Sequence, residues 1–156
     1  MTPQITIIIP PETQARLAKL ETLPDELPLA IARGMDFAMA QVRGRIQTQR
    51  LGGKGPYPPA EHRLGIVSQK LQESLREEKS VIVGSTITAA IGSNIFYGVL
   101  HEYGFEKDDV VRGKGKPFKL TIPERAPVRT GIEENADYIS QEIGNSIDET
   151  LTETGA

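Results

Sequence analysis

Two histidines and a neighbouring carboxylate are the side chains of this chain best suited to acid–base or metal chemistry. His62 follows a proline-rich stretch, and His101 is followed directly by Glu102. A zinc site needs ligands whose spacing brings them together around one ion. Two histidine ligands on one face of a helix are four residues apart, and His62 and His101 are not. Adjacent residues on a helix point to different sides, so His101 and Glu102 would not face one ion together. We therefore predict no metal site and no bound cofactor.

The sequence also lacks the motifs of a catalytic nucleophile and of a nucleotide-binding site. The chain has no cysteine, which excludes disulfides, thiolate zinc sites and cysteine nucleophiles. Ser85 and Ser93 each follow a glycine but lack the G-x-S-x-G arrangement of a nucleophile elbow. The run at 52–55, GGKG, lacks the glycine spacing and the terminal Lys-Ser/Thr of a phosphate-binding loop. We predict no catalytic residue.

Glu102 is better explained as a structural group. A buried carboxylate must be satisfied by hydrogen bonds or by an opposite charge. We expect Glu102 to accept hydrogen bonds from backbone amides or to pair with an arginine such as Arg125. Around it, one apolar side of a short helix is formed by Phe96, Val99, Leu100 and Tyr103.

Hydrophobic periodicity predicts two long helices in a single domain of 156 residues. One covers 25–50 and ends at Gly52-Gly53, and the other covers 131–152 and frays toward the C-terminus. Shorter helices are expected over 12–20, over about 67–76, and over 95–103 with Gly104 as the terminator.

Runs of β-branched residues predict a small antiparallel sheet. A hairpin is expected over 80–91 around Gly84-Ser85, with a third strand at 117–122 and an N-terminal strand at 4–9. The segments 51–63 and 105–116 are rich in glycine, proline or charge and are expected to be flexible loops. The predicted fold class is α+β, with the sheet packed against the two long helices.

Charge is distributed unevenly along a chain of net charge −3. Lys and Arg dominate 41–70 and 111–129, whereas 132–156 carries seven acids and no base. Opposite charges of this kind can dock neighbouring molecules. No apolar run approaches the ~20 residues that span a bilayer, and the N-terminus lacks a secretory signal pattern. We expect no membrane association and synthesis in the cytoplasm.

Two motifs together resemble a bacteriophage family. The run Asn94–Gly104, NIFYGVLHEYG, is followed by Ile122–Pro127, IPERAP, and is preceded by Pro56–Pro59 and by LGIVSQKLQESL at 64–75. The chain is similar here to the virion-morphogenesis or tail-completion proteins, also called neck or head–tail joining proteins. Their motifs read Y-A-x-x-H-E-F-G and I-P-A-R-P-F-L. The residues that carry the resemblance are Tyr97, His101, Glu102, Tyr103, Gly104, Pro123 and Arg125.

Two positions depart from the family pattern. IPERAPVR replaces the arginine-proline-phenylalanine ending, so local packing there must differ. Ser68-Gln69 replaces a Thr/Ser-Gly pair upstream.

The resemblance implies a non-enzymatic virion component of a tailed phage or prophage. It would form a ring, often of six subunits, at the neck or the head-proximal end of the tail, completing the tail or head and joining the two. Its partners would be itself and other phage neck, portal-connector or tail-tube proteins, with DNA passing transiently through the lumen. A closed ring needs two different complementary faces on each subunit. Candidate interface residues are Arg112, Lys114, Lys116, Glu133, Glu134 and Asp137, and candidate lumen contacts are Arg50 and Lys54.

The sequence also leaves open a function of a different kind. Arg43, Arg45, Arg50 and His101 would instead serve a stand-alone nucleic-acid-binding or hydrolytic protein. Genes for portal, capsid and tail-tube proteins beside this one would favour the virion component.

Overall fold

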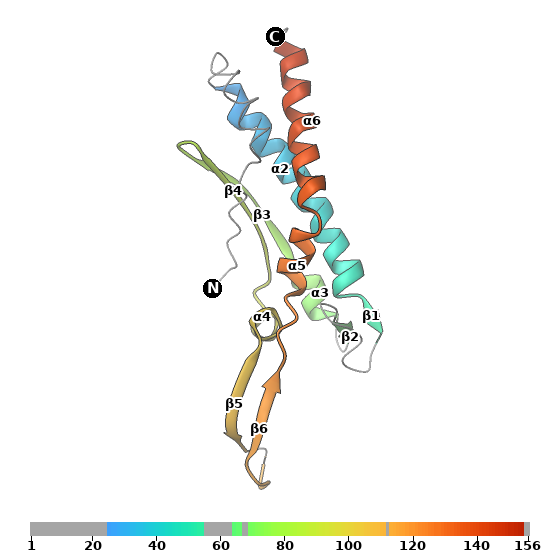
Figure 1. Cartoon of the computed structure of the whole chain (residues 1–156), viewed down its shortest axis with the longest axis vertical. Coiled ribbons are helices and arrows are strands. Elements are labelled where there is room, and N and C mark those ends of the chain that lie inside the picture. The colour runs from blue at the N-terminus through green and yellow to red at the C-terminus, as the bar shows by residue number, and fades with distance from the viewer. Residues whose placement is uncertain (1–24, 55–63, 67–68, 112, 155–156) are drawn as a thin grey trace. The chain divides into compact units, whose positions relative to one another are not determined.

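The computed structural model describes residues 25–54, 64–66, 69–111 and 113–154, and these form the predicted α+β fold (Figure 1). In chain order the elements are α2 (Glu26–Arg45), the π-helical turn η1 (Ile46–Arg50), β1 (Gly53–Lys54), β2 (Gly65–Ile66), α3 (Lys70–Ser74), β3 (Arg76–Val83), β4 (Thr86–Gly92), α4 (Phe96–Tyr103), β5 (Phe105–Val110), β6 (Phe118–Ile122), α5 (Pro127–Glu133) and α6 (Ala136–Thr154). Contacts divide them into two compact units. The first contains α2 as far as Gly44, the β3–β4 hairpin and α6, and the second contains the remaining elements.

In the first unit, α2 and α6 pack closely along a stripe of small residues. Ala30, Gly34 and Ala38 lie four residues apart on α2 and are all buried. A Cβ added to Gly34 would lie 2.8 Å from the main-chain oxygen of Glu142 in α6, so only glycine permits this approach. The hydroxyl of Ser146 on α6 donates to the carbonyl of Ala30 at 2.8 Å. The two backbones are therefore held in near contact.

The apolar core of the first unit follows the predicted helical stripes. Seven residues of α2 are buried, and α6 contributes three isoleucines from one face. The hairpin adds the end of β4. The buried apolar side chains of this unit are Ala30, Ile31, Met35, Ala38, Met39, Val42, Ala89, Ala90, Ile91, Ile139, Ile143 and Ile147.

A β-bulge attaches the β3–β4 hairpin to α2. The antiparallel register shifts between Glu78 and Val81, which leaves Ser80 outside the paired positions. The Ser80 amide instead donates to Oδ1 of Asp36 at 2.6 Å, and its hydroxyl donates to the Ala32 carbonyl at 3.1 Å. At the bulge, Ser80 thus makes two hydrogen bonds to α2 in place of pairing with β4.

The second unit is built on η1. Gln47 and Gln72 exchange hydrogen bonds, each side-chain amide donating to the main-chain carbonyl of the other at 2.7 and 2.8 Å. A Cβ added to Gly131 of α5 would lie 2.5 Å from Cγ1 of Ile46, so α5 lies directly against η1. The buried apolar side chains of this unit are Ile46, Leu51, Leu64, Leu75, Ala126 and Ile132.

The strands form two separate antiparallel hairpins and a short parallel pair of β1 with β2, and the single sheet predicted from the sequence is wrong. The strand predicted at 117–122 does not join the hairpin at 80–91. It is β6, which pairs antiparallel with β5, and β5 lies within the segment 105–116 that we predicted to be a loop. Within the described ranges each hairpin has only its two strands. Four of the six β5 residues are exposed, so the strand has no apolar alternation by which to recognise it.

Helix boundaries differ from the prediction in two places. A turn at Glu134-Asn135 separates α5 from α6, so the helix predicted at 131–152 does not begin at 131. The short helix predicted to reach residue 76 is only α3, and β3 already starts at Arg76. The helix predicted at 25–50 continues from α2 into the π-helical turn. The N-terminal strand predicted at 4–9, the helix at 12–20 and most of the loop at 51–63 lie outside the described residues.

Candidate functional site

The two sequence motifs meet in one hydrogen-bonded cluster of the second unit. Glu102 on α4 is only 5% exposed. Its Oε2 accepts the Val128 amide at 3.0 Å, and its Oε1 accepts the Arg129 amide at 2.7 Å. These are the second and third residues of α5, whose first-turn amides have no partner within the helix. Glu102 therefore caps α5, and the prediction that backbone amides satisfy this carboxylate is confirmed.

The main chain on either side of Glu102 completes the same junction. The carbonyl of His101 accepts the amides of Arg125 and Ala126 at 2.9 and 3.1 Å. Gly104 ends α4 with a φ of +73°, and a Cβ there would lie 3.0 Å from the amide nitrogen of Glu124. Both the conformation and the space favour glycine. We call residues 101–104 and 124–129 the motif cluster.

The electrostatics of the motif cluster favour a structural role. Burial raises the pKa of Glu102, while the hydrogen bonds from Arg129 and Val128 oppose this rise. Burial, followed by the positive charge of Arg125, lowers the pKa of His101. The lowered pKa favours the neutral imidazole of His101, and both oxygens of the neighbouring carboxylate are used in capping α5. This geometry holds two chain segments together.

The aromatic side chains of α4 are exposed, contrary to the packing we expected of Phe96 and Tyr103. Phe96 is 75% and Tyr103 is 52% exposed, and the buried residue of this helix is Glu102. Tyr97 is 38% exposed as well. The inward face of α4 carries Glu102, whose carboxylate caps α5, and Gly98, which lies against Leu71. Arg125 in the motif cluster is buried, whereas Pro123 is exposed.

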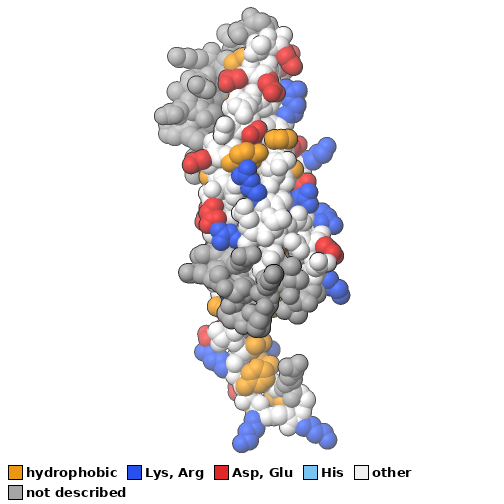
Figure 2. All heavy atoms as spheres, turned by 90° about the vertical axis from the view of Figure 1, so that its right-hand side faces the viewer, with side chains coloured by type: hydrophobic (Ala, Val, Ile, Leu, Met, Phe, Trp, Pro, Cys, Tyr) orange, Lys and Arg blue, Asp and Glu red, His pale blue; other side chains and the backbone are white. Residues whose placement is uncertain are grey.

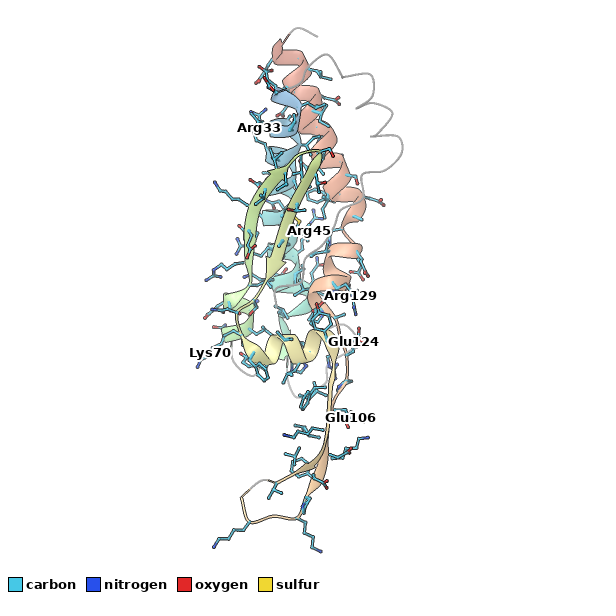
Figure 3. The ribbon with its side chains drawn as sticks, turned by 90° about the vertical axis from the view of Figure 1, so that its left-hand side faces the viewer. Arg33, Arg45, Lys70, Glu106, Glu124 and Arg129 are labelled. Carbon is cyan, nitrogen blue, oxygen red and sulfur yellow. The ribbon has the colours of Figure 1, made fainter. Side chains whose placement is uncertain are left out.

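The β5–β6 hairpin carries the predicted basic interface residues. Lys114 and Lys116 are exposed in the turn between its strands, and Arg112 lies outside the described residues. Figure 2 shows Lys and Arg side chains at the end of this hairpin, with hydrophobic side chains beside them. Val111 and Phe118 are 55% and 43% exposed. Side chains project from both faces of the ribbon (Figure 3).

The remaining predicted site residues lie on separate elements. Glu133, Glu134 and Asp137 are exposed where α5 gives way to α6, and they belong to the first unit, whereas the hairpin belongs to the second. Arg50, a candidate DNA contact, is partly exposed at the end of η1. Lys54, the other candidate, lies in β1.

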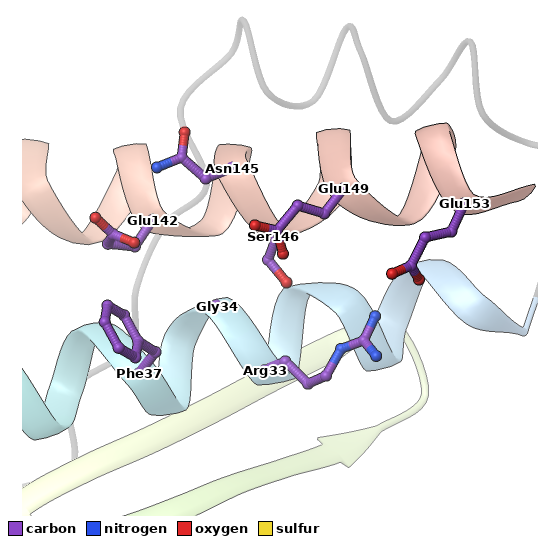
Figure 4. Close-up of a pocket in the computed structure, with 8 residues that line it drawn as sticks. All are labelled: Arg33, Gly34, Phe37, Glu142, Asn145, Ser146, Glu149 and Glu153. Atoms are coloured by element: carbon purple, nitrogen blue, oxygen red, sulfur yellow. The ribbon is translucent and has the colours of Figure 1, made fainter.

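A groove of about 390 Å³ runs between α2 and α6 in the first unit (Figure 4). Its lining residues are Arg33, Gly34, Phe37, Glu142, Asn145, Ser146, Glu149 and Glu153.

None of these lining residues was predicted from the sequence as a site residue, and Arg33 was assigned only to a solvated face of the helix. Two signals could have found them. Phe37 is an aromatic residue that falls off the apolar stripe of α2, and the structure leaves it 55% exposed. Glu142, Glu149 and Glu153 recur at helical spacing and so share one face of α6.

Comparisons with protein-family models, curated proteins and solved structures found no match to this chain. Within the described ranges, no three His, Cys, Asp or Glu side chains come together as a metal site would require. No described helix has the length and apolar character needed to cross a membrane.

Proposed function

We propose that this chain is a structural virion-assembly protein of a tailed phage or prophage. It forms a ring at the neck or the head-proximal end of the tail, completes the tail or head, and joins the two. The motif cluster supports this proposal, because the two family-like motifs, about twenty residues apart in the sequence, are joined by backbone and capping hydrogen bonds. A resemblance confined to two segments is more specific when the segments form one structural unit.

The observation that carries the proposal is the β5–β6 hairpin. It has two strands, most of its side chains are exposed, and its base is anchored by Gly104 and the motif cluster. A two-stranded ribbon is marginally stable in water by itself. Such a ribbon gains stability when a neighbouring subunit covers it, which is what a ring assembled head to tail provides.

The exposed charges fit an assembly of this kind. Lys114 and Lys116 occupy the hairpin turn, and Glu133, Glu134 and Asp137 are exposed on the other unit. Each subunit thus offers a basic and an acidic surface, and such charges can supply the complementarity of a heterologous interface.

Deleting the gene from its phage or prophage tests the proposed function. We expect particles with unjoined heads and tails in electron micrographs, and restoration of joined virions by a plasmid copy of the wild-type gene. Normal infectious virions from the deletion strain would overturn the proposal. Flanking genes for portal, capsid and tail-tube proteins would support it independently.

Because DNA would pass through the ring, we expect a weak interaction between the DNA phosphates and basic side chains of the protein. Arg50 and Lys54 are the candidate contacts, and their binding should be insensitive to sequence and should fall steeply with salt. Fluorescence anisotropy with a labelled duplex at low and physiological salt measures this. No binding at low salt removes the lumen contact, whereas tight binding that persists at physiological salt favours a stand-alone nucleic-acid-binding protein.

A further inference from the structure

We propose that the groove between α2 and α6 receives the lysine-bearing turn of the β5–β6 hairpin from a second copy of this chain. The inference rests on the proposed ring assembly and names the contact that would build it. The groove lies wholly in the first unit and the hairpin wholly in the second, so every copy carries one of each. Repeating one such contact from copy to copy is the head-to-tail pattern that closes rings.

The groove is shaped by the close approach of the two helices. Gly34 brings the α2 backbone against α6, and Ser146 ties α6 to α2 through the Ala30 carbonyl. Phe37 leaves its ring 55% exposed at one side (Figure 4). With a volume of about 390 Å³ the groove falls within the range of about 300–1,000 Å³ typical of ligand-binding clefts. An exposed turn with long side chains is a suitable occupant.

The charges of the groove call for a cationic occupant. Glu142, Glu149 and Glu153 come from one face of α6. Arg33 is the basic residue of the lining, and its Nη2 donates to the hydroxyl of Thr150 at 2.9 Å. Figure 4 shows the Arg33 guanidinium on the side of Glu153, and the Phe37 ring on the side of Glu142. An entering cation is therefore expected near Glu142, Phe37 and Glu149, away from Arg33.

The hairpin turn has the complementary chemistry. Lys114 and Lys116 are exposed, and the turn from Val111 to Phe118 contains no acidic residue. Gly113 has a φ of +64° with open space around it, a conformation that favours glycine in the turn. A lysine can place its ammonium between carboxylates and lay its apolar stem, or its charge, on an aromatic ring. Phe37 and the two glutamates beside it offer both partners.

Charge reversal on either side provides the test. The turn variant carries Lys114→Glu and Lys116→Glu, and the groove variant carries Glu142→Lys and Glu149→Lys. Circular dichroism and thermal melting establish that each is folded. The matched controls are Lys79→Glu on β3 and Asp148→Lys on α6, which are exposed and lie outside the contact.

Sedimentation velocity at low salt measures association of the purified full chain. We expect the wild type and both controls to self-associate, and each charge-reversed variant to do so at least about tenfold more weakly, because like charges then face each other. Mixing the two variants should restore association, since every turn then meets a groove of opposite charge on the other variant. An intramolecular contact would not be restored by mixing.

Cross-linking locates the contact. A carbodiimide joins lysines to carboxylates only when they touch, and a mixture of ¹⁴N- and ¹⁵N-labelled wild-type chains separates contacts between copies from contacts within one. We expect mixed-label cross-links from Lys114 or Lys116 to Glu142 or Glu149. Three results would overturn the inference: a wild-type chain that remains monomeric, variants that associate like the wild type, or a mixture that does not recover.

The deletion strain tests the proposed function and the charge-reversed variants test this contact, so either proposal can be rejected without the other. Unjoined heads and tails in the deletion strain, together with unchanged association of the turn variant, would retain the virion role and reject the contact. Normal virions without the gene would reject the role itself.

Discussion

Replacing Glu102 should destabilise the protein, because its carboxylate caps a helix from a buried position. Glu102→Ala removes the acceptor of the Val128 and Arg129 amides. Loss of a cap costs typically about 1 kcal/mol, and part-buried donors left without partners add about 1–2 kcal/mol, so we expect a total of about 2–3 kcal/mol. Removing a buried charge offsets part of the sum. Glu102→Gln keeps one acceptor oxygen but sets an NH₂ group against the other amide, for about 1–2 kcal/mol.

Two measurements test this loss of stability. Urea unfolding gives the free energy, and the melting temperature of the alanine variant should fall by roughly 4–10 °C. Hydrogen exchange at the Val128 and Arg129 amides gives the local effect and should accelerate in both variants. Asp108→Asn is the control, because it removes an exposed carboxylate from the same unit. If Glu102→Ala unfolded at the wild-type urea concentration, or if exchange at both amides were unchanged, the capping role would be refuted.

Three further outcomes follow from the same contacts. Because the pKa of Glu102 is raised in the folded state, the stability from this group should decline as pH rises from about 4.5 through the raised pKa. Urea midpoints across that range should show this decline in the wild type and not in Glu102→Gln. Gly34→Ala should cost about 1–3 kcal/mol through its clash with α6, whereas Gly44→Ala, on the same helix with open space, should stabilise by about 0.5–1 kcal/mol; equal melting temperatures would contradict the close packing. Gly104→Ala should cost about 1–2 kcal/mol through its positive φ, and an unchanged unfolding free energy would show that the junction tolerates a side chain.

The sequence by itself determined the elements that have one buried and one exposed face. The stripes of α2 and α6 are visible because helices packed on one side repeat apolar residues at helical spacing. Gly84 in the first hairpin turn and Gly104 after α4 were also predictable, since both have positive φ. The need of Glu102 for hydrogen-bond donors followed from the cost of burying a carboxylate.

Only the tertiary structure decided which segments pair and pack together, because the local sequence pattern of a segment does not specify its contact partner. The strand β5 is exposed on most of its length, so no period marks it, and its pairing with β6 depends on contacts across a turn. The choice of the Val128 and Arg129 amides as partners of Glu102, and the contact of Gly131 with Ile46, join segments that are distant in the sequence. The groove exists because Gly34 meets α6, and no sequence of one helix specifies the surface of another.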